Sequence, residues 1–292
     1  MTFSAIVTQY EAAIRLTLFF AVFGIMALWE LLAPRRTLTV SKGMRWTHNL
    51  SLVLLNTIIL RLLFPAAAVG VAIFASSNGW GLFNYFGISY PLAIVLSVIA
   101  MDLVIYFQHV LLHALPTLWR LHRVHHADLD YDVTTGSRFH PLEIVLSMLV
   151  KFSAILLLGV PAAAVVVFEV VLNVMAMFNH GNVGLPPMTD RLLRFLIVTP
   201  DMHRVHHSVE DNEANSNFGF NLSLWDRLFG TYIDQPRAGH VGMTIGIRQY
   251  REPKQVSRLP GMLALPFAGK VSGYAINRRN WKDTRDGGKG KD

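Results

Sequence analysis

Four long apolar runs limit what this chain can fold into, and they occupy residues 13–32, 49–75, 90–107 and 144–178. About 20 mostly apolar residues are enough for an α-helix to cross a bilayer. The last run is too long for one ordinary span, and Gly159 and Pro161 lie near its centre. Because proline is unfavourable inside a helix, this run predicts two helices joined by a tight hairpin. The chain is therefore predicted to form an all-α integral membrane bundle of about four to five transmembrane helices.

The composition supports a membrane location. Hydrophobic residues make up 52% of the 292 residues and charged residues only 15%, whereas soluble domains carry about 25% charged residues. The chain has no cysteine, which excludes a disulfide framework and a thiolate metal site, so any metal must be bound by nitrogen and oxygen. The net charge of +7 is more typical here of basic loops at a cytoplasmic leaflet than of nucleic-acid binding, because we see no basic patch interleaved with aromatic residues.

The loop after the first apolar run is basic, since it carries Arg35, Arg36, Lys42 and Arg45. Positively charged loops tend to remain in the cytoplasm, so this loop is predicted to be cytoplasmic and the N-terminus to lie outside. Counted from there, three spans and one hairpin bring all the histidine motifs described below to the cytoplasmic side. The histidines are therefore expected in a cytosolic helical cap.

The first and last apolar runs together contain four ionisable residues. Arg15 and Glu30 lie near the ends of the first run, where their long side chains are expected to reach the membrane surface. Lys151 and Glu169 lie within the two predicted hairpin helices. Because a charge inside a membrane is costly, these two residues are expected to be functional or to pair with each other.

Three histidine motifs indicate metal binding. His109 and His113 form H-x-x-x-H, and H-x-x-H-H occurs twice, at His122, His125 and His126 and at His203, His206 and His207. Residues three or four apart lie on one face of a helix, so each motif would direct its imidazoles to a common point. Neutral imidazole is the commonest protein metal ligand. In a chain with so few charges, these repeated motifs favour a metal site over a solvated surface patch.

Between the second and third motifs, the predicted hairpin returns the chain to the same side at His180, which we count as a ninth candidate ligand. Nine ligands are too many for one ion with about four to six coordination positions, so the set suits two metals. Asp102 is predicted either to accept a hydrogen bond from a ligand imidazole or to make a buried bond between helices. The remaining residues that could orient the ligands are His140, Glu143 and Asn179, although His140 and Glu143 could instead cap the next helix.

The order of these motifs resembles the fatty acid hydroxylase superfamily of membrane oxygenases, in particular bacterial sterol desaturase-like members. The resemblance covers about residues 109–232 and includes the phrases RFHPLE, NHGN, TPDMHRVHHS and NFGFNLSLWDRLFGTY. It implies a catalytic region over residues 109–235, including the hairpin 144–178, after a transmembrane region 1–108 and before a basic tail 236–292. It also implies a bacterial inner membrane location.

The resemblance further implies two iron ions held by the nine histidines, with zinc possible as a substitute and no catalytic residue beyond the metal centre. The expected reaction is hydroxylation or desaturation of an unactivated C–H bond in a sterol, fatty acyl, alkyl or carotenoid lipid. Dioxygen would be the oxidant, and electrons would come from a separate donor such as a ferredoxin, a cytochrome b5-like protein or a reductase. No flavin- or nicotinamide-binding fingerprint is evident in the sequence.

Two other functions remain compatible with the residues alone. A zinc-dependent membrane hydrolase or isomerase could use the same ligands without electrons. A metal transporter would also need buried histidines, although transporters usually place their ligands near the middle of the bilayer. Neither the spacing nor the composition identifies the lipid substrate.

Overall fold

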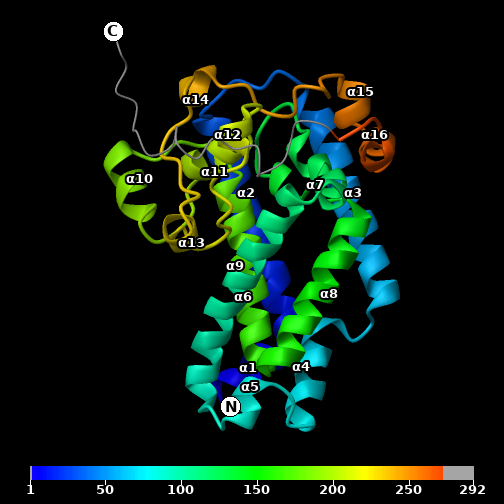
Figure 1. The fold of residues 1–292 in the computed structure, drawn as a ribbon, viewed down its shortest axis with the longest axis vertical. Helices are drawn as coiled ribbons and strands as arrows, with labels where there is room; N and C mark the ends of the chain where they lie inside the picture. The colour runs from blue at the N-terminus through cyan, green and yellow to red at the C-terminus, as the bar shows by residue number, and fades with distance from the viewer. Residues whose placement is uncertain (1, 272–292) are drawn as a thin grey trace.

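The computed structural model describes residues 2–271, which form a helical bundle with a broad cap at one end (Figure 1). The long helices are α2 (Glu11–Leu32), α3 (Lys42–Leu63), α6 (Tyr90–Ala114), α8 (Pro141–Leu158) and α9 (Ala162–Asn179). The bundle end away from the cap also contains α1 (Phe3–Gln9), α4 (Ala67–Ser77) and α5 (Leu82–Tyr85). The cap contains α7 (Pro116–His126), η1 (Thr135–Ser137), α10 (Pro187–Leu193), α11 (Pro200–His206), α12 (Asp211–Ala214), α13 (Leu224–Leu228), α14 (Gly239–Gly242), α15 (Pro253–Val256), α16 (Leu259–Ala264) and η2 (Leu265–Phe267).

The predicted all-α membrane bundle is confirmed. Five segments are helical, long and apolar enough to cross a membrane, namely 11–32, 42–85, 90–114, 141–158 and 162–179. The second segment is not one straight helix, because α3 ends at Leu63 and α4 starts at Ala67. Pro65 lies in this break and cannot donate the backbone hydrogen bond that would continue α3.

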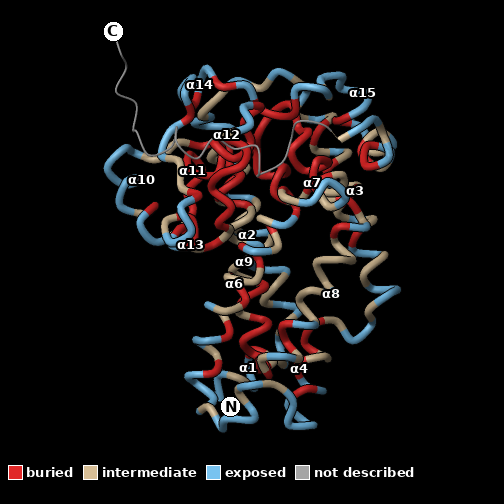
Figure 2. Tube along the Cα trace, viewed as in Figure 1, coloured by how far each residue is buried: buried red, intermediate tan, exposed pale blue. Residues whose placement is uncertain are grey.

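The cap buries most of its residues, whereas the bundle leaves much of its surface exposed (Figure 2), and many of the exposed side chains of the bundle are large and apolar. On α2, for example, Phe20, Ile25 and Leu28 are all more than half exposed. Large apolar patches of this kind mark surfaces that meet a membrane or another protein. Together with the length of the helices, this pattern indicates that lipid covers the bundle.

The predicted hairpin is confirmed at Gly159 and Pro161. Gly159 ends α8 in the left-handed conformation with a φ of 73°, and Pro161 is the N-cap of α9. A side chain is also excluded at Gly81 in the neighbouring loop, because its Cβ atom would lie 2.0 Å from the backbone nitrogen of Gly159. The two loops pack this closely because both contacting residues are glycines.

A buried ionic network joins α3 to the loop between α7 and η1. Arg45 donates to Asp128 through two nitrogens, at 2.9 and 2.7 Å, and also pairs with Asp132. Arg138 lies 3.6 Å from Asp128 and donates to the carbonyl of Val124 at the end of α7. Burial would raise the pKa of Asp128, but Arg45 and Arg138 hold it well below its ordinary value. The ion pairs of this network therefore hold the loop that follows the second histidine motif in place.

The basic residues of the loop after α2 are paired inside the cap. Arg35 forms a salt bridge with Asp201 at 3.0 Å, Lys42 lies 3.6 Å from Glu30, and Arg45 belongs to the ionic network. Arg36 donates to backbone carbonyls around α14, including that of Met243 at 2.6 Å. These charges hold the cap together, so their number is not an independent indication of which side of the membrane the cap occupies.

The expectation that Arg15 and Glu30 extend to the membrane surface is wrong. Glu30 is 4% exposed and accepts hydrogen bonds from the backbone nitrogens of Val133 and Asn182, at 2.6 and 2.9 Å. Arg15 turns inward and forms a salt bridge with Glu169 at 2.7 Å. Both side chains meet buried partners, which lowers the cost of their charge more than partial hydration at the surface would. The predicted pairing of Lys151 with Glu169 is confirmed.

The segment expected as a basic tail is part of the cap as far as residue 271. Its helices α15, α16 and η2 follow one another, and η2 packs against α7. Arg123 on α7 donates to the carbonyls of Leu265 and Ala268. The rest of the expected tail, residues 272–292, lies outside the described residues.

Candidate metal centre

The three histidine motifs meet in the cap although they lie on separate helices. The first motif ends α6, the second ends α7, and the third lies on α11 and the residue after it. His180 follows the last residue of α9 and joins them. All nine rings are at most 5% exposed, so they form a single buried cluster shielded from water.

The nine histidines separate into two groups that could each hold a metal ion. The candidate ligand atoms within a group all lie within 4.8 Å of one another. The first group contains His109, His113, His122, His126 and His206. The second group contains His125, His180, His203 and His207.

Each H-x-x-H-H motif contributes to both groups, and the two motifs do so in opposite ways. On α7, the i and i+4 residues His122 and His126 belong to the first group, and the i+3 residue His125 belongs to the second. In the third motif, the i and i+4 residues belong to the second group, and the i+3 residue His206 belongs to the first. Consecutive residues of a helix point about 100° apart, so a histidine pair in sequence can reach two adjacent sites.

Hydrogen bonds from one ring nitrogen orient three rings of the first group. His109 Nδ1 lies 2.9 Å from the carbonyl oxygen of Phe218, and His206 Nδ1 lies 2.7 Å from that of Ser216. His122 Nδ1 lies 2.7 Å from Glu143 Oε1. In each ring the carbonyl or carboxylate oxygen accepts a hydrogen bond from Nδ1–H, which leaves the lone pair on Nε2 available to a metal.

The unpaired ring nitrogens fit bound cations. The Nε2 atoms of His109, His122 and His206 are buried without a hydrogen-bond partner. In the second group, His180 donates from Nδ1 to the carbonyl of Ala176 at 2.8 Å, while its Nε2 lies 3.2 Å from His125 Nε2 and 3.1 Å from His203 Nε2. Two ligands about 2.1 Å from one ion and at right angles to each other are separated by about 3 Å, which matches these contacts.

Burial keeps the rings outside the membrane-spanning helices in the neutral form that binds metal. Loss of water lowers the pKa of His122 and of His180 from 6.5 to about 3. Burial, and then the neighbouring histidines, lower the pKa of His203, His206 and His207 well below 6.5. Because a metal ion competes with protons for the same lone pairs, neutral rings need release no proton when they bind it.

The comparisons with known proteins agree with this arrangement. Residues 94–231 match the model of the family described as fatty acid hydroxylase. This part of the chain, which contains all nine clustered histidines, is similar to the fatty acid hydroxylase family. No solved structure matches the chain.

Three curated relatives of the chain carry names of lipid-modifying enzymes. An ornithine lipid hydroxylase of Rhizobium tropici is 30% identical over 65% of this chain and 55% of its own length. A human alkylglycerol monooxygenase is 29% identical over 54% of this chain and 34% of its own length. A fatty acid hydroxylase of Lecanicillium is 29% identical over 54% of this chain and 47% of its own length. The chain thus spans about half or less of the length of these relatives.

Glu143 is the predicted orienting residue that contacts a histidine directly. It accepts from His122 through Oε1, while its Oε2 atom is buried without a partner. His140 instead caps α8, because its side chain accepts from the backbone nitrogen of Leu142 at 3.2 Å. His140 was expected either to orient a ligand or to cap the next helix, and this contact corresponds to the capping role.

Asp102 and Asn179 support the loop that follows the third motif. Asp102 accepts from the backbone nitrogens of Asn221 and Leu222, at 3.3 and 3.2 Å, and from the indole nitrogen of Trp225 at 2.8 Å. Of the two roles predicted for Asp102, these contacts correspond to the buried structural bond and not to a hydrogen bond from a ligand imidazole. Asn179 donates to the carbonyl of Phe220 at 2.9 Å, so it contacts the same loop.

Sequence reasoning missed the residues that present backbone oxygens to the rings. Asp226 accepts hydrogen bonds from the backbone nitrogens of Phe218 and Gly219, at 2.7 and 2.8 Å. It thereby fixes the turn in which the carbonyl of Phe218 accepts a hydrogen bond from His109. The phrase NFGFNLSLWDRLFGTY contains Asp226 and was visible in the sequence. The role of Asp226 could not be predicted, because the ring contacts a backbone carbonyl, which every residue type provides.

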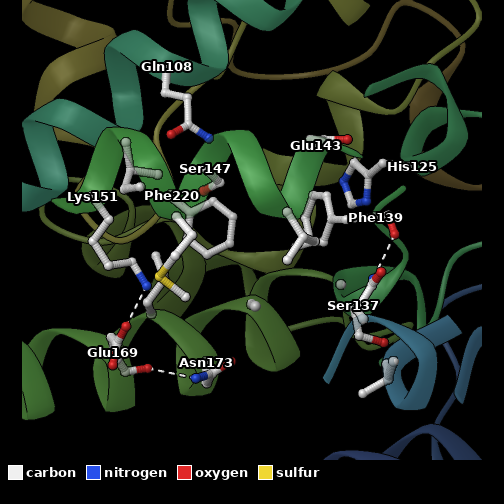
Figure 3. Close-up of a pocket in the computed structure, with 18 of the residues that line it drawn as sticks. Gln108, His125, Ser137, Phe139, Glu143, Ser147, Lys151, Glu169, Asn173 and Phe220 are labelled. Atoms are coloured by element: carbon white, nitrogen blue, oxygen red, sulfur yellow. Dashed lines mark hydrogen bonds and ion pairs between the residues drawn. The ribbon is translucent and has the colours of Figure 1, made fainter. Parts of the chain in front are cut away.

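A cavity of about 390 Å³ extends from the histidine groups into the bundle. Rings of both groups line it, namely His109 and His122 of the first group and His125 and His203 of the second. Its middle is largely apolar, with contributions from α3, α6, α8 and α9. Figure 3 shows His125 and Glu143 at one end, Phe139, Ser147 and Phe220 between, and the Lys151–Glu169 pair with Asn173 at the other.

Proposed function

We propose that this protein is a membrane-bound di-iron oxygenase that hydroxylates or desaturates an unactivated C–H bond of a lipid, using dioxygen and electrons from a separate donor. The observation that carries the proposal is the cavity, because it joins both histidine groups to an apolar space between membrane-spanning helices. A lipid chain could enter this space without leaving hydrocarbon. The names of the three relatives support the same reaction class.

Two iron ions account best for the ligand set. The two groups offer five and four imidazoles, so each could hold one ion and still leave a coordination position open. Soluble di-iron bundles use carboxylates with E-x-x-H pairs, whereas here imidazoles take that place. Nitrogen ligands also suit zinc and copper, so the assignment to iron rests on the family. Iron bound here would supply the activation of dioxygen.

The side chains of this protein would bind the substrate, orient the histidines and exclude water from the cavity. Phe139 stacks on His125 with ring centroids 4.6 Å apart, and Phe220 lines the adjoining part of the cavity. These apolar walls would hold a substrate chain against the metal centre and keep bulk water away. Glu143 would hold His122 in its tautomer, with the proton on Nδ1. Their contribution is therefore positioning rather than proton transfer to the substrate.

The proposed hydroxylation places one oxygen atom of dioxygen in the C–H bond and releases the other as water. The balance requires two electrons, which we assign to a ferredoxin, a cytochrome b5-like protein or a reductase, and two protons, which come from the solvent. The proposed location is a bacterial inner membrane with the metal centre on the cytoplasmic side, where such donors are found. Desaturation would use the same oxidant and donor and release both oxygen atoms as water.

The test is lipid analysis of cells that produce the protein under 18O₂. Hydroxylation predicts a new lipid that gains one 18O atom, and desaturation predicts one that loses two hydrogens. His206→Ala should abolish the product, whereas His48→Ala, which changes a histidine outside both groups, should not. A product that also forms without oxygen, or that requires zinc alone, would show a hydrolase or isomerase instead.

A further inference from the structure

Three charged side chains from different helices meet at the end of the cavity away from the histidines. Arg15 on α2 lies 2.7 Å from Glu169 Oε2 on α9, and Lys151 on α8 pairs with Glu169 Oε1. Asn173, one turn further along α9, donates to the backbone carbonyl of Glu169 at 2.8 Å. All four residues line the cavity, as Figure 3 shows for the last three. We call Arg15, Lys151 and Glu169 the charged triad.

Lys151 and Glu169 lie near the middle of their helices, whereas Arg15 lies near the start of α2. Lys151 is eight residues after Glu143 on α8, which corresponds to about 12 Å at a rise of about 1.5 Å per residue. Glu169 is eleven residues before His180 on α9, or about 16 Å by the same rise. The triad is thus separated from the histidine groups by most of the apolar part of the cavity.

The triad carries more positive charge than holding three helices together requires. One carboxylate faces two cations, and a single cation would neutralise it. Glu11, the first residue of α2, lies 3.6 Å from Arg15, which is longer than the 2.7 Å between Arg15 and Glu169, so Glu11 compensates Arg15 less than Glu169 does. An ionisable group within a span usually marks a site of function, because its charge is otherwise costly there. The surplus cation therefore favours an anionic group in the cavity.

We propose that the charged triad binds the carboxylate of a single-chain lipid and thereby selects which carbon reaches the metal centre. Arg15 and Lys151 would donate to the carboxylate, and Glu169 would hold both cations at the cavity wall. The apolar walls between the triad and the histidines would contact the alkyl chain. The distance along α8 and α9 then places the oxidised carbon about 12–16 Å from the carboxylate, far from its α-carbon.

This inference deepens the proposed function, but the binding step requires no metal. The experiment measures equilibrium binding of radiolabelled palmitate and of methyl palmitate to the full chain in nanodiscs, without added iron. The wild type should bind palmitate more tightly than the ester, which lacks the anionic group. Lys151→Met should weaken palmitate binding about tenfold or more and leave the ester unchanged, because a hydrogen bond to a charged group is lost. Lys151→Arg should restore most of the affinity.

Two further variants separate a binding site from a structural cluster. Arg61→Met is the matched control, because Arg61 is an exposed cation on α3 that does not line the cavity. Glu169→Gln removes the competing carboxylate, so the proposal expects palmitate to bind at least as tightly as in the wild type. A merely structural triad would give equal binding of acid and ester, or no change in Lys151→Met, and either result would overturn the proposal. A protein that passes this test but makes no oxidised lipid would contradict only the oxygenase assignment.

Discussion

Glu143 Oε1 lies 2.7 Å from His122 Nδ1, which leaves the buried Nε2 atom of that ring without a partner. The carboxylate comes from the first turn of α8 and the imidazole from the last turns of α7. A membrane-spanning helix thus fixes the orientation of a histidine in the cap. The start of α8 is therefore part of the candidate metal centre although it contributes no candidate ligand.

Removing this carboxylate should weaken metal binding by the first histidine group. Glu143→Leu is expected to lower the affinity about 10- to 100-fold, the usual cost of losing a group that orients a metal-bound histidine. Glu143→Gln should cost less, since its amide oxygen can still accept from Nδ1. Metal competition with a chelator measures both effects, and Glu252→Gln, at an exposed position, is the control. Equal affinities in the Glu143→Leu variant and the wild type would remove Glu143 from the metal centre.

Pairs of substitutions should distinguish the two histidine groups. His125→Ala with His203→Ala removes two of four ligands from the second group and leaves the first complete. We expect this variant to retain about half of the metal, because each group binds its ion with its own ligands. His126→Ala with His206→Ala should instead affect the first group, and elemental analysis with spectroscopy distinguishes the remaining ion. Loss of all metal in both double variants would show that the groups act as one site.

Asp102 should matter for stability more than for metal chemistry. Its carboxylate receives two backbone nitrogens and the indole of Trp225 inside the protein. Asp102→Ala should lower the free energy of unfolding by about 3 kcal/mol, since it leaves buried donors unsatisfied, while Trp225→Phe removes one donor and should cost about 1 kcal/mol. Thermal unfolding midpoints in one detergent measure both. A larger loss in Trp225→Phe than in Asp102→Ala would contradict this account of the loop.

The metal-free protein should become less stable as the pH falls below about 6.5. The pKa of His122 and of His180 is lowered to about 3 in the folded state, whereas unfolded histidines titrate near 6.5. Between these values the unfolded chain binds more protons, so stability rises with pH and is lost on acidification. Each such histidine contributes at most about 1.4 kcal/mol per pH unit. Thermal unfolding from pH 7 to pH 4 should show this slope, and bound metal should raise the unfolding midpoint at each pH, because it binds the folded state.

The apolar runs and the histidine spacing predicted the bundle and the cluster because both depend on local periodicity. Gly159 and Pro161 marked the hairpin for the same reason. The division of His125 from His126 between two groups was not predictable, since it depends on how α7 and α11 pack against each other. The inward turn of Arg15 likewise depends on Glu169, which lies on another helix.

The most direct test of the di-iron assignment is Mössbauer spectroscopy with elemental analysis of protein purified from cells grown on iron-57. We predict about two irons per chain, one for each histidine group, with the signal of a magnetically coupled pair. His48→Ala should leave that signal unchanged, because His48 lies outside both groups. A fully active protein that holds zinc and gains nothing from iron would contradict the assignment.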